Sequence, residues 1–249
     1  MKVVFAGGGT GGHLYPAIAI SEQLKKHNIE FYFMVSNRGI ERNILTPLNY
    51  QFEEQNVTAF MGVSLSGKIK AIINMIKASS RAFKVVKKGD KVILTGGFAA
   101  APSAIAAILK GCDLYLHEQN SVMGLVNRIF AKFSKKVFLS FEHSKNAKGN
   151  TIITGNPVRE VFYSKEQKKD FTNKLLILGG SQGSRKINKL ISSSIDEIIS
   201  LGYNVCHQCG KKLYDETLEM YGEKLEQYKD KLEVKPYINE AVEEMAKAD

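Results

Sequence analysis

Residues 7–13 of the chain are Gly7-Gly8-Gly9-Thr10-Gly11-Gly12-His13, and they follow the short apolar stretch 2–6. That stretch predicts a buried strand, and the residues after the glycines, with Pro16 in the first turn, predict a helix. Glycines let backbone amides approach a ligand closely, and the N-terminus of a helix favours negative charge. The segment therefore predicts a phosphate or oxyanion cradle, although a plain tight turn would use the same glycines.

Short β-branched or aromatic stretches alternate with longer stretches of helical period along the rest of the chain. This alternation predicts βαβ units and largely parallel sheets. The expected strands span residues 2–6, 30–36, 51–57, 91–95, 113–116, 136–139, 151–154, 175–178, 203–207 and 232–237. We expect an α/β fold with two Rossmann-like doubly wound units, residues 1–160 and 161–249. The second unit is expected to be incomplete, as in a truncated chain, because three strands make half of such a sheet.

Composition excludes several classes of protein. The chain has 249 residues, 44% hydrophobic and 24% charged, which is ordinary for a globular protein and unlike disordered, collagenous or coiled-coil sequences. We expect no membrane span and no signal peptide, because no run of about 18 apolar residues occurs. Three cysteines favour a reducing cytosol. Cys206 and Cys209 form a single pair beginning in an expected strand, and no Asp-x-Asp occurs, so we predict no metal site.

Positive charge is concentrated in the first unit. Residues 1–160 hold 21 Lys and Arg against 10 Asp and Glu, whereas residues 161–249 hold 14 against 15. This asymmetry indicates an anionic partner, such as nucleic acid, lipid headgroups or a phosphorylated substrate. A nucleic-acid role is disfavoured because the basic stretch 64–88 contains one aromatic residue, Phe83, and offers no stacking platform.

Residues 64–88 hold seven Lys and Arg and no acid, and they have the pattern of an amphipathic helix. One face is basic and the other side is apolar. The basic face holds Lys70, Lys77, Arg81, Lys84 and Lys88, and the apolar side holds Ile69, Ile72, Ile76 and Phe83. Such a helix can lie on an anionic membrane, or it can be a crossover helix with its apolar stripe against the sheet.

Two further glycine turns follow expected strands, Gly96-Gly97-Phe98 and residues 179–185. Open α/β sheets bind ligands at the carboxyl ends of their strands, so the recurrence of these turns predicts binding sites along that edge. Gly7, Gly9 and Gly12 also match the dinucleotide fingerprint, with Arg38 suited to a 2′-phosphate. An NADP-dependent oxidoreductase is therefore an open alternative.

Polar residues at the same edge are candidates for chemistry. His13 lies within the first glycine turn and is a candidate general base, or else a structural hydrogen-bonding group. His117-Glu118-Gln119-Asn120 follows the expected strand 113–116. This cluster indicates recognition or catalysis, or in part a helix N-cap supplied by Asn120 or Ser121.

Four motifs occurring in this order resemble the MurG family of bacterial N-acetylglucosaminyltransferases of peptidoglycan synthesis. They are residues 8–13, His117-Glu118-Gln119-Asn120, Gly155-Asn156-Pro157-Val158-Arg159 and Gly179-Gly180-Ser181-Gln182-Gly183. The resemblance implies a GT-B fold. It also implies inverting transfer of GlcNAc from UDP-GlcNAc to the muramyl C4 hydroxyl of lipid I, undecaprenyl-pyrophosphoryl-MurNAc-pentapeptide, giving lipid II at the cytoplasmic face of the membrane.

The resemblance also implies roles for individual residues. His13 would be the catalytic base, and UDP-GlcNAc would contact Thr10, Gly11, Gly12, Asn120, Arg159, Ser181 and Ile238. Acceptor contacts would come from Gly96, Gly97, Phe98, His117 and Glu118, and membrane contacts from Ile69, Ile72, Ile76, Lys77, Arg81 and Lys84. No metal or other cofactor is expected, and no oligomeric state is predicted. Family members continue past the position of Asp249, so an inactive fragment that binds acceptor and membrane is the alternative.

Overall fold

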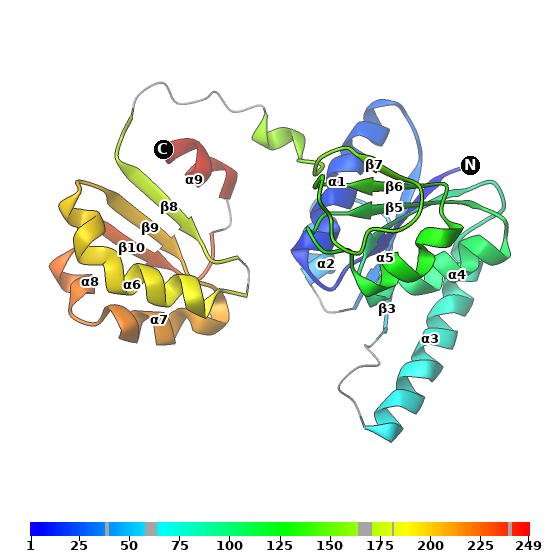
Figure 1. Ribbon diagram of the computed structural model, residues 1–249, viewed down its shortest axis with the longest axis horizontal. Helices are drawn as coiled ribbons and strands as arrows, with labels where there is room; N and C mark the ends of the chain where they lie inside the picture. Colours follow the sequence, from blue (N-terminus) through cyan, green and yellow to red (C-terminus); the bar gives the residue numbers. More distant parts are fainter. Residues whose placement is uncertain (38–39, 58–63, 164–170, 181, 239–240) are drawn as a thin grey trace. The chain divides into compact units, whose positions relative to one another are not determined.

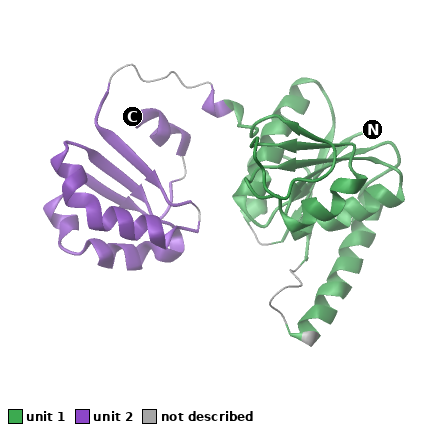
Figure 2. Ribbon diagram, in the orientation of Figure 1, with its two compact units in different colours: residues 1–160 green, residues 161–249 purple. Residues whose placement is uncertain are grey.

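The computed structural model describes residues 1–37, 40–57, 64–163, 171–180, 182–238 and 241–249. The chain divides into two compact units, Met1–Glu160 and Val161–Asp249 (Figure 2). Each unit is an α/β layer structure with its own core.

Unit 1, the part of Figure 1 that holds the N-terminus, contains a seven-stranded parallel sheet. The strand order is β3-β2-β1-β4-β5-β6-β7. The order reverses between β1 and β4, so the loops after these two strands lie at the topological switch point where such sheets bind ligands. The strands are β1 Val3–Gly7, β2 Phe31–Ser36, β3 Phe52–Gln55, β4 Lys91–Gly96, β5 Asp113–Glu118, β6 Lys136–Leu139 and β7 Thr151–Ile153.

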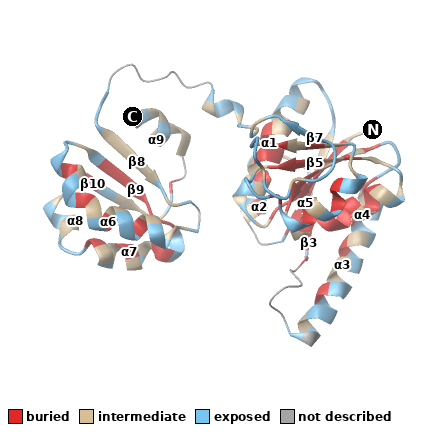
Figure 3. Cartoon of the chain, viewed as in Figure 1, coloured by how far each residue is buried: buried red, intermediate tan, exposed pale blue. Residues whose placement is uncertain are grey.

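Helices cover both faces of this sheet, because alternate strand residues point to opposite sides. Val3 and Phe5 pack with α1 and α2, whereas Val4 and Ala6 belong to the core beneath α3, α4 and α5. Figure 3 shows the buried residues of this unit in red. The helices are α1 Gly11–Lys26, α2 Ile40–Leu45, α3 Leu65–Val85, α4 Ala101–Leu109 and α5 Leu125–Phe130, with short 3-10 turns η1 Phe98–Ala100, η2 Ala131–Phe133 and η3 Glu160–Phe162.

Helix α3 differs from the prediction at its end, and its packing decides between the two interpretations of its apolar stripe. It ends at Val85, so Lys88 lies beyond the helix instead of on its basic face. The face that packs inward consists of alanines, Ala71, Ala78 and Ala82, and the predicted apolar stripe lies opposite, with Ile69 56% and Ile76 64% exposed. The interpretation that this stripe packs against the sheet is therefore wrong. None of the helices that the structure describes is long and apolar enough to cross a membrane.

Unit 2 is smaller, with a three-stranded parallel sheet in the order β10-β9-β8. Its core joins Ile195 and Ile199 of α6 to Val205, Tyr221 and Leu232. The elements are β8 Lys174–Leu178, α6 Arg185–Ser200, β9 Asn204–Gln208, η4 Lys211–Leu213, α7 Tyr214–Tyr221, α8 Lys224–Gln227, β10 Leu232–Lys235 and α9 Ala241–Lys247. The expected α/β class with parallel sheets is confirmed.

Candidate active site

The first glycine turn is pressed between the ends of two neighbouring strands. Gly8 and Gly9 have positive φ values of 135° and 92°. A Cβ built on Gly97 would lie 2.4 Å from the carbonyl oxygen of Gly8, so the loops after β1 and β4 approach more closely than any side chain would allow. The two predicted glycine turns of unit 1 are thus brought together.

Helix α1 begins directly after this turn, with Thr10 as its N-cap residue. In the described structure the amides of Thr10, Gly11 and Gly12 donate to no protein acceptor, whereas the amide of His13 already donates to the Thr10 carbonyl at 3.2 Å. Thr10 and Gly12 are exposed. Free amides at a helix N-terminus favour an anionic ligand at this position.

His13 is half-buried beneath the turn, and its position is set by the end of β4. Its Nδ1 lies 3.0 Å from the carbonyl oxygen of Thr95. A carbonyl accepts hydrogen bonds only, so Nδ1 carries the proton and Nε2 is left as the basic nitrogen. Burial lowers the pKa of His13 below its usual value, while the Thr95 carbonyl and the Glu118 charge act in the opposite direction. The ring is therefore neutral at physiological pH.

Gln119 also contacts the Nδ1 atom of His13 through its side-chain amide. The Nε2 atom of Gln119 faces His13 Nδ1, and the buried Oε1 atom of Gln119 has no hydrogen-bond partner in the described part of the chain. Turning the amide over places Oε1 against the Nδ1 proton, which satisfies both groups. Gln119 and Thr95 then hold the same tautomer of His13.

Glu118 is almost fully buried, and its carboxylate is surrounded by donors. Oε1 accepts from the backbone and side chain of Asn120 at 3.1 and 3.0 Å. Oε2 accepts from the Gly124 amide at 2.8 Å and from Asn127 Nδ2 at 3.0 Å. Glu118 therefore holds the loop after β5, and it holds Asn120, which is exposed, at the sheet edge.

The polar cluster begins inside a strand and not after it, which corrects the predicted end of the strand at residue 116. Strand β5 continues to Glu118 because His117 and Glu118 pair with Phe138 and Leu139 of β6. His117 is buried, its Nε2 lies 3.4 Å from Ser140 Oγ, and burial lowers its pKa. The side chains of His117 and Glu118 both face the protein interior. Their acceptor contacts remain predictions.

The other predicted residues of unit 1 lie near the same edge. The Arg159 guanidinium stacks over the Tyr15 ring of α1, 4.9 Å from its centroid. Gly96 lies against the His13 ring, because a Cβ there would be 2.9 Å from Nδ1. Phe98 instead packs against the hydrophobic core, so its predicted acceptor role would be indirect.

In unit 2 the glycine turn after β8 is held by the side chain of Gln208. Its Oε1 accepts from the Gly180 amide at 3.1 Å, and its Nε2 donates to the carbonyls of Gly180 and Pro236 at 2.9 and 3.3 Å. Gln208 thereby ties the turn to the residues after β10, where Ile238 is buried. Ser181 lies outside the described residues.

A buried, uncharged network of hydrogen bonds lies beside this edge of the unit 2 sheet. His207 has no exposed surface, and its Nδ1 lies 2.8 Å from Tyr221 Oη and its Nε2 3.2 Å from Asn188 Oδ1. Asn188 Nδ2 in turn donates to Thr217 Oγ1 and to the Cys209 carbonyl. Burial lowers the pKa of His207 to about 4. The network is therefore uncharged at neutral pH.

The cysteine pair has no arrangement for metal or redox chemistry. Cys206 and Cys209 are both buried, and burial raises the pKa of each thiol, which disfavours the reactive thiolate. Among the described residues, no three His, Cys, Asp or Glu side chains cluster as metal ligands would. The expectation of a metal-independent reaction stays a prediction.

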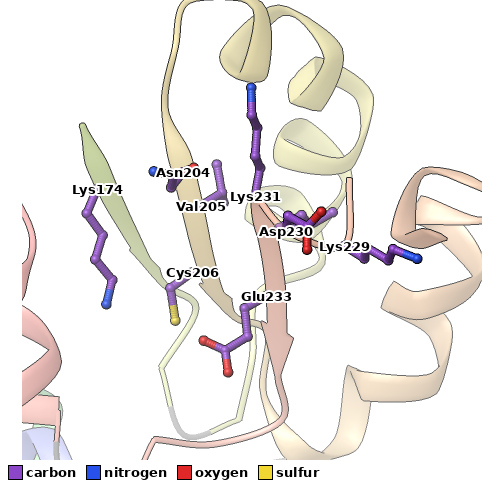
Figure 4. A pocket seen from close by; sticks show the side chains of 9 residues that line it. Lys174, Asn204, Val205, Cys206, Lys229, Asp230, Lys231 and Glu233 are labelled. Atoms are coloured by element: carbon purple, nitrogen blue, oxygen red, sulfur yellow. The ribbon is translucent and has the colours of Figure 1, made fainter. Parts of the chain in front are cut away.

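A pocket of about 160 Å³ in unit 2 lies away from these loops. Its lining residues come from the amino ends of the strands, with Lys174 of β8, Cys206 of β9 and Glu233 of β10 side by side (Figure 4). Lys174 is paired with Glu244 at 3.0 Å. Parallel sheets bind ligands at the opposite end of their strands, so we do not assign this pocket to the candidate site.

Several residues of the site carried no signal in the sequence. Glu41 and Gln208 are buried polar side chains that hold loops far from them along the chain, and Asn127 is a buried amide that donates to the Glu118 carboxylate. Glu41, for example, accepts from the Gly9 amide across 32 residues. Arg38, on which the NADP alternative depends, lies outside the described residues.

Each unit matches a domain of a known protein family. The glycosyltransferase family 28 N-terminal domain matches residues 3–139, and the family 28 C-terminal domain matches residues 174–249. Among solved structures, MurG from Acinetobacter baumannii aligns over 100% of this chain and 71% of its own, with a TM-score of 0.66 and 25% identity. The two-unit architecture is therefore of the GT-B class.

Two curated relatives carry the name UDP-N-acetylglucosamine–N-acetylmuramyl-(pentapeptide) pyrophosphoryl-undecaprenol N-acetylglucosamine transferase. The one from Geotalea uraniireducens is 34% identical over 100% of this chain and 71% of its own length. The one from Helicobacter hepaticus is 36% identical over 84% of this chain and 60% of its own length. The chain thus spans less than the full length of these relatives. It belongs to glycosyltransferase family 28 and, within that family, to the MurG group of N-acetylglucosamine transferases.

Proposed function

We propose that this chain transfers GlcNAc from UDP-GlcNAc to the C4 hydroxyl of MurNAc in undecaprenyl-pyrophosphoryl-MurNAc-pentapeptide, with inversion at the anomeric carbon. The observation that carries the proposal is the neutral His13 ring, held by the Thr95 carbonyl beside a turn of free amides. Family membership supports N-acetylglucosamine transfer, and this geometry supplies a base next to an anion site.

His13 activates the acceptor in this mechanism. Its unprotonated Nε2 accepts the hydroxyl proton as the hydroxyl oxygen attacks the anomeric carbon. The new bond joins that oxygen to the sugar, and the bond between the sugar and the β-phosphate breaks. UDP departs with the electron pair. Thr95 and Gln119 stabilise the imidazolium form through Nδ1, as the partner of a catalytic histidine does in other enzymes.

Backbone dipoles stabilise the negative charge in this proposal. The glycine turn of unit 1 presents the free amides of Thr10, Gly11 and Gly12, and α1 adds the positive end of its dipole. No metal is included, because these groups can supply the electrostatic stabilisation. Turnover is expected to be unchanged, within about twofold, in excess EDTA, since no described cluster of side chains provides metal ligands.

We further propose that α3 holds the chain on the anionic cytoplasmic face of the membrane. Four isoleucines and Phe83 are exposed on the face opposite the buried alanines, and Lys77, Arg81 and Lys84 flank them on exposed surface. An apolar stripe beside a basic face is the arrangement of an interfacial helix. The acceptor's lipid tail makes this location necessary for the proposed reaction.

The function is tested by supplying both substrates to the 249-residue chain and measuring transfer of radiolabelled GlcNAc to the lipid-linked acceptor. We expect transfer, and stabilisation in a thermal-shift assay by UDP-GlcNAc but not by NADPH. Stabilisation by NADPH alone would support the oxidoreductase alternative. Acceptor binding without transfer would support the alternative of an inactive fragment.

Membrane binding is tested by flotation with vesicles of phosphatidylglycerol and phosphatidylcholine. Charge reversal of Lys77, Arg81 and Lys84, and separately Ile72→Ser with Ile76→Ser, should each reduce the bound fraction. Charge reversal of Lys211 and Lys212 in unit 2 is the matched control. Binding that persists in the α3 variants would contradict this part of the proposal, as would binding insensitive to salt.

A further inference from the structure

Glu41 is a carboxylate with no exposed surface at the carboxyl edge of the unit 1 sheet. It comes from α2, and its Oε1 atom accepts hydrogen bonds from the Gly9 amide and from Ser36 Oγ, the latter at 2.6 Å. Its Oε2 atom has no hydrogen-bond partner within the described structure. A buried carboxylate that places one oxygen on a glycine turn and leaves the other unpaired has a cost that a purely structural residue would avoid.

The amide that Glu41 occupies is the one that a dinucleotide would use. In the fingerprint matched by Gly7, Gly9 and Gly12, the second glycine lets the backbone approach a pyrophosphate. Here the Gly9 amide already donates to Glu41 Oε1, and a Cβ on the neighbouring Gly8 would lie 2.6 Å from the same oxygen. A phosphate oxygen at the Gly9 amide would have to displace this hydrogen bond and lie beside a negative charge.

We propose that Glu41 is a positioning and specificity residue, an internal anion that orders the Gly8–Gly9 turn and excludes a diphosphate from the Gly9 amide. Anions at this loop then bind to the amides of Thr10, Gly11 and Gly12, which are free of protein acceptors in the described structure. The inference rests on the proposed function in assuming that the loop binds a substrate diphosphate. It predicts that a loop with the dinucleotide spacing does not bind a dinucleotide here.

The test uses the 249-residue chain labelled with ¹⁵N at glycine, so that the loop amides are followed individually by NMR. The variants are Glu41→Gln, which keeps the shape and removes the charge, and Glu41→Ala, which removes the acceptor. Glu54→Gln is the matched control. Glu54 of β3 pairs with Arg42 of α2, the helix that carries Glu41, and it does not contact the loop. Inorganic pyrophosphate is the anion probe, and formate is the probe for the missing carboxylate.

We expect the Gly9 amide resonance to move in both Glu41 variants and not in the control, and formate to restore most of its position in Glu41→Ala. Pyrophosphate should shift Gly11 and Gly12 but not Gly9 in the unchanged chain. It should bind Glu41→Gln about tenfold more tightly, because a neighbouring negative charge is gone. If Glu41→Ala fails to fold, the Glu41→Gln comparison decides.

An unchanged Gly9 resonance in Glu41→Gln would overturn the positioning role. A pyrophosphate shift at Gly9 in the unchanged chain, or no shift at any loop glycine, would overturn the specificity role. A chain that shows the expected shifts but transfers no GlcNAc would contradict the proposed function and leave the Glu41 inference standing.

Discussion

In unit 1 the loops at the carboxyl ends of β1 and β5 are held by two buried carboxylates, Glu41 and Glu118, whereas in unit 2 the loop after β8 is held by the neutral amide of Gln208. Beneath these loops the difference continues. In unit 1 burial lowers the pKa of His13, and the Thr95 carbonyl and the Glu118 charge oppose this effect. In unit 2 His207 lies in a network without charge.

The contrast lies in the charge that each unit places beside the loops of its edge. A carboxylate favours a proton-accepting imidazole but repels a diphosphate, while neutral side chains leave backbone amides free of competing charge. We therefore propose that the neutral turn of unit 2 contributes to nucleotide binding, as the resemblance implies for Ser181 and Ile238, while His13 of unit 1 activates the acceptor. The predictions below test the difference between the two edges, from the largest expected effect to the smallest.

Replacing Glu118 by alanine should produce the largest loss of stability. The change leaves donors from Asn120, Gly124 and Asn127 without an acceptor in a buried site, which costs about 3–5 kcal/mol in the free energy of unfolding of unit 1. Hydrogen exchange with mass spectrometry measures each unit separately, and it suits a chain without tryptophan.

The exposed Glu142 provides the control. Glu142→Ala should change the free energy of unfolding of unit 1 by less than about 0.5 kcal/mol. If Glu118→Ala left the exchange of unit 1 unchanged while reducing transfer, Glu118 would instead be a direct substrate ligand.

Acid should weaken unit 2 through His207. Its pKa is about 4 in the folded chain and near 6.5 when unfolded, so between these pH values the unfolded state binds more protons. Its stabilisation is complete above pH 6.5 and is lost as the pH falls toward 4, a total of about 3 kcal/mol. Hydrogen exchange of unit 2 at pH 7 and pH 5 measures the slope.

His207→Gln should remove this part of the pH dependence, and His27→Gln, at an exposed position in unit 1, should not. Equal slopes for the His207 variant and the unchanged chain would show that the network tolerates a charge.

Converting the neutral anchor of unit 2 into a carboxylate should have the smallest effect of the three. In Gln208→Glu the new oxygen faces the carbonyls of Gly180 and Pro236, which costs about 1–3 kcal/mol and places a negative charge beside the turn. UDP-GlcNAc affinity, measured by calorimetry, should fall about tenfold or more.

The exposed Gln227 gives the control Gln227→Glu. A Gln208→Glu chain that bound UDP-GlcNAc normally would remove the distinction between charged and neutral edges.

Local patterns in the sequence predicted much of the fold. Strand β6 was predicted at its observed residues, and β8 and β9 within one residue, because alternating burial and glycine turns are local signals. The predicted end of β5 at residue 116 is wrong, because the polar residues His117 and Glu118 are kept in the strand by pairing with β6. The prediction that α3 extends to Lys88 is also wrong, because periodicity does not indicate where a helix ends.

The site was predictable where its groups are adjacent in sequence and unpredictable where they are not. His13 lies within the glycine turn and was identified directly. Glu41 and Gln208 act on turns 32 and 28 residues away, so neither periodicity nor spacing marks them. Packing alone decided which side of α3 is buried, because alanine fits closely where isoleucine does not.

The most direct test of the central claim compares GlcNAc transfer by the unchanged chain, by His13→Ala and by the control His143→Ala, whose side chain is exposed. We predict that kcat falls by about 10²-fold or more in His13→Ala and is unchanged in the control. Near-normal turnover by His13→Ala, or no transfer by the unchanged chain, would contradict the account.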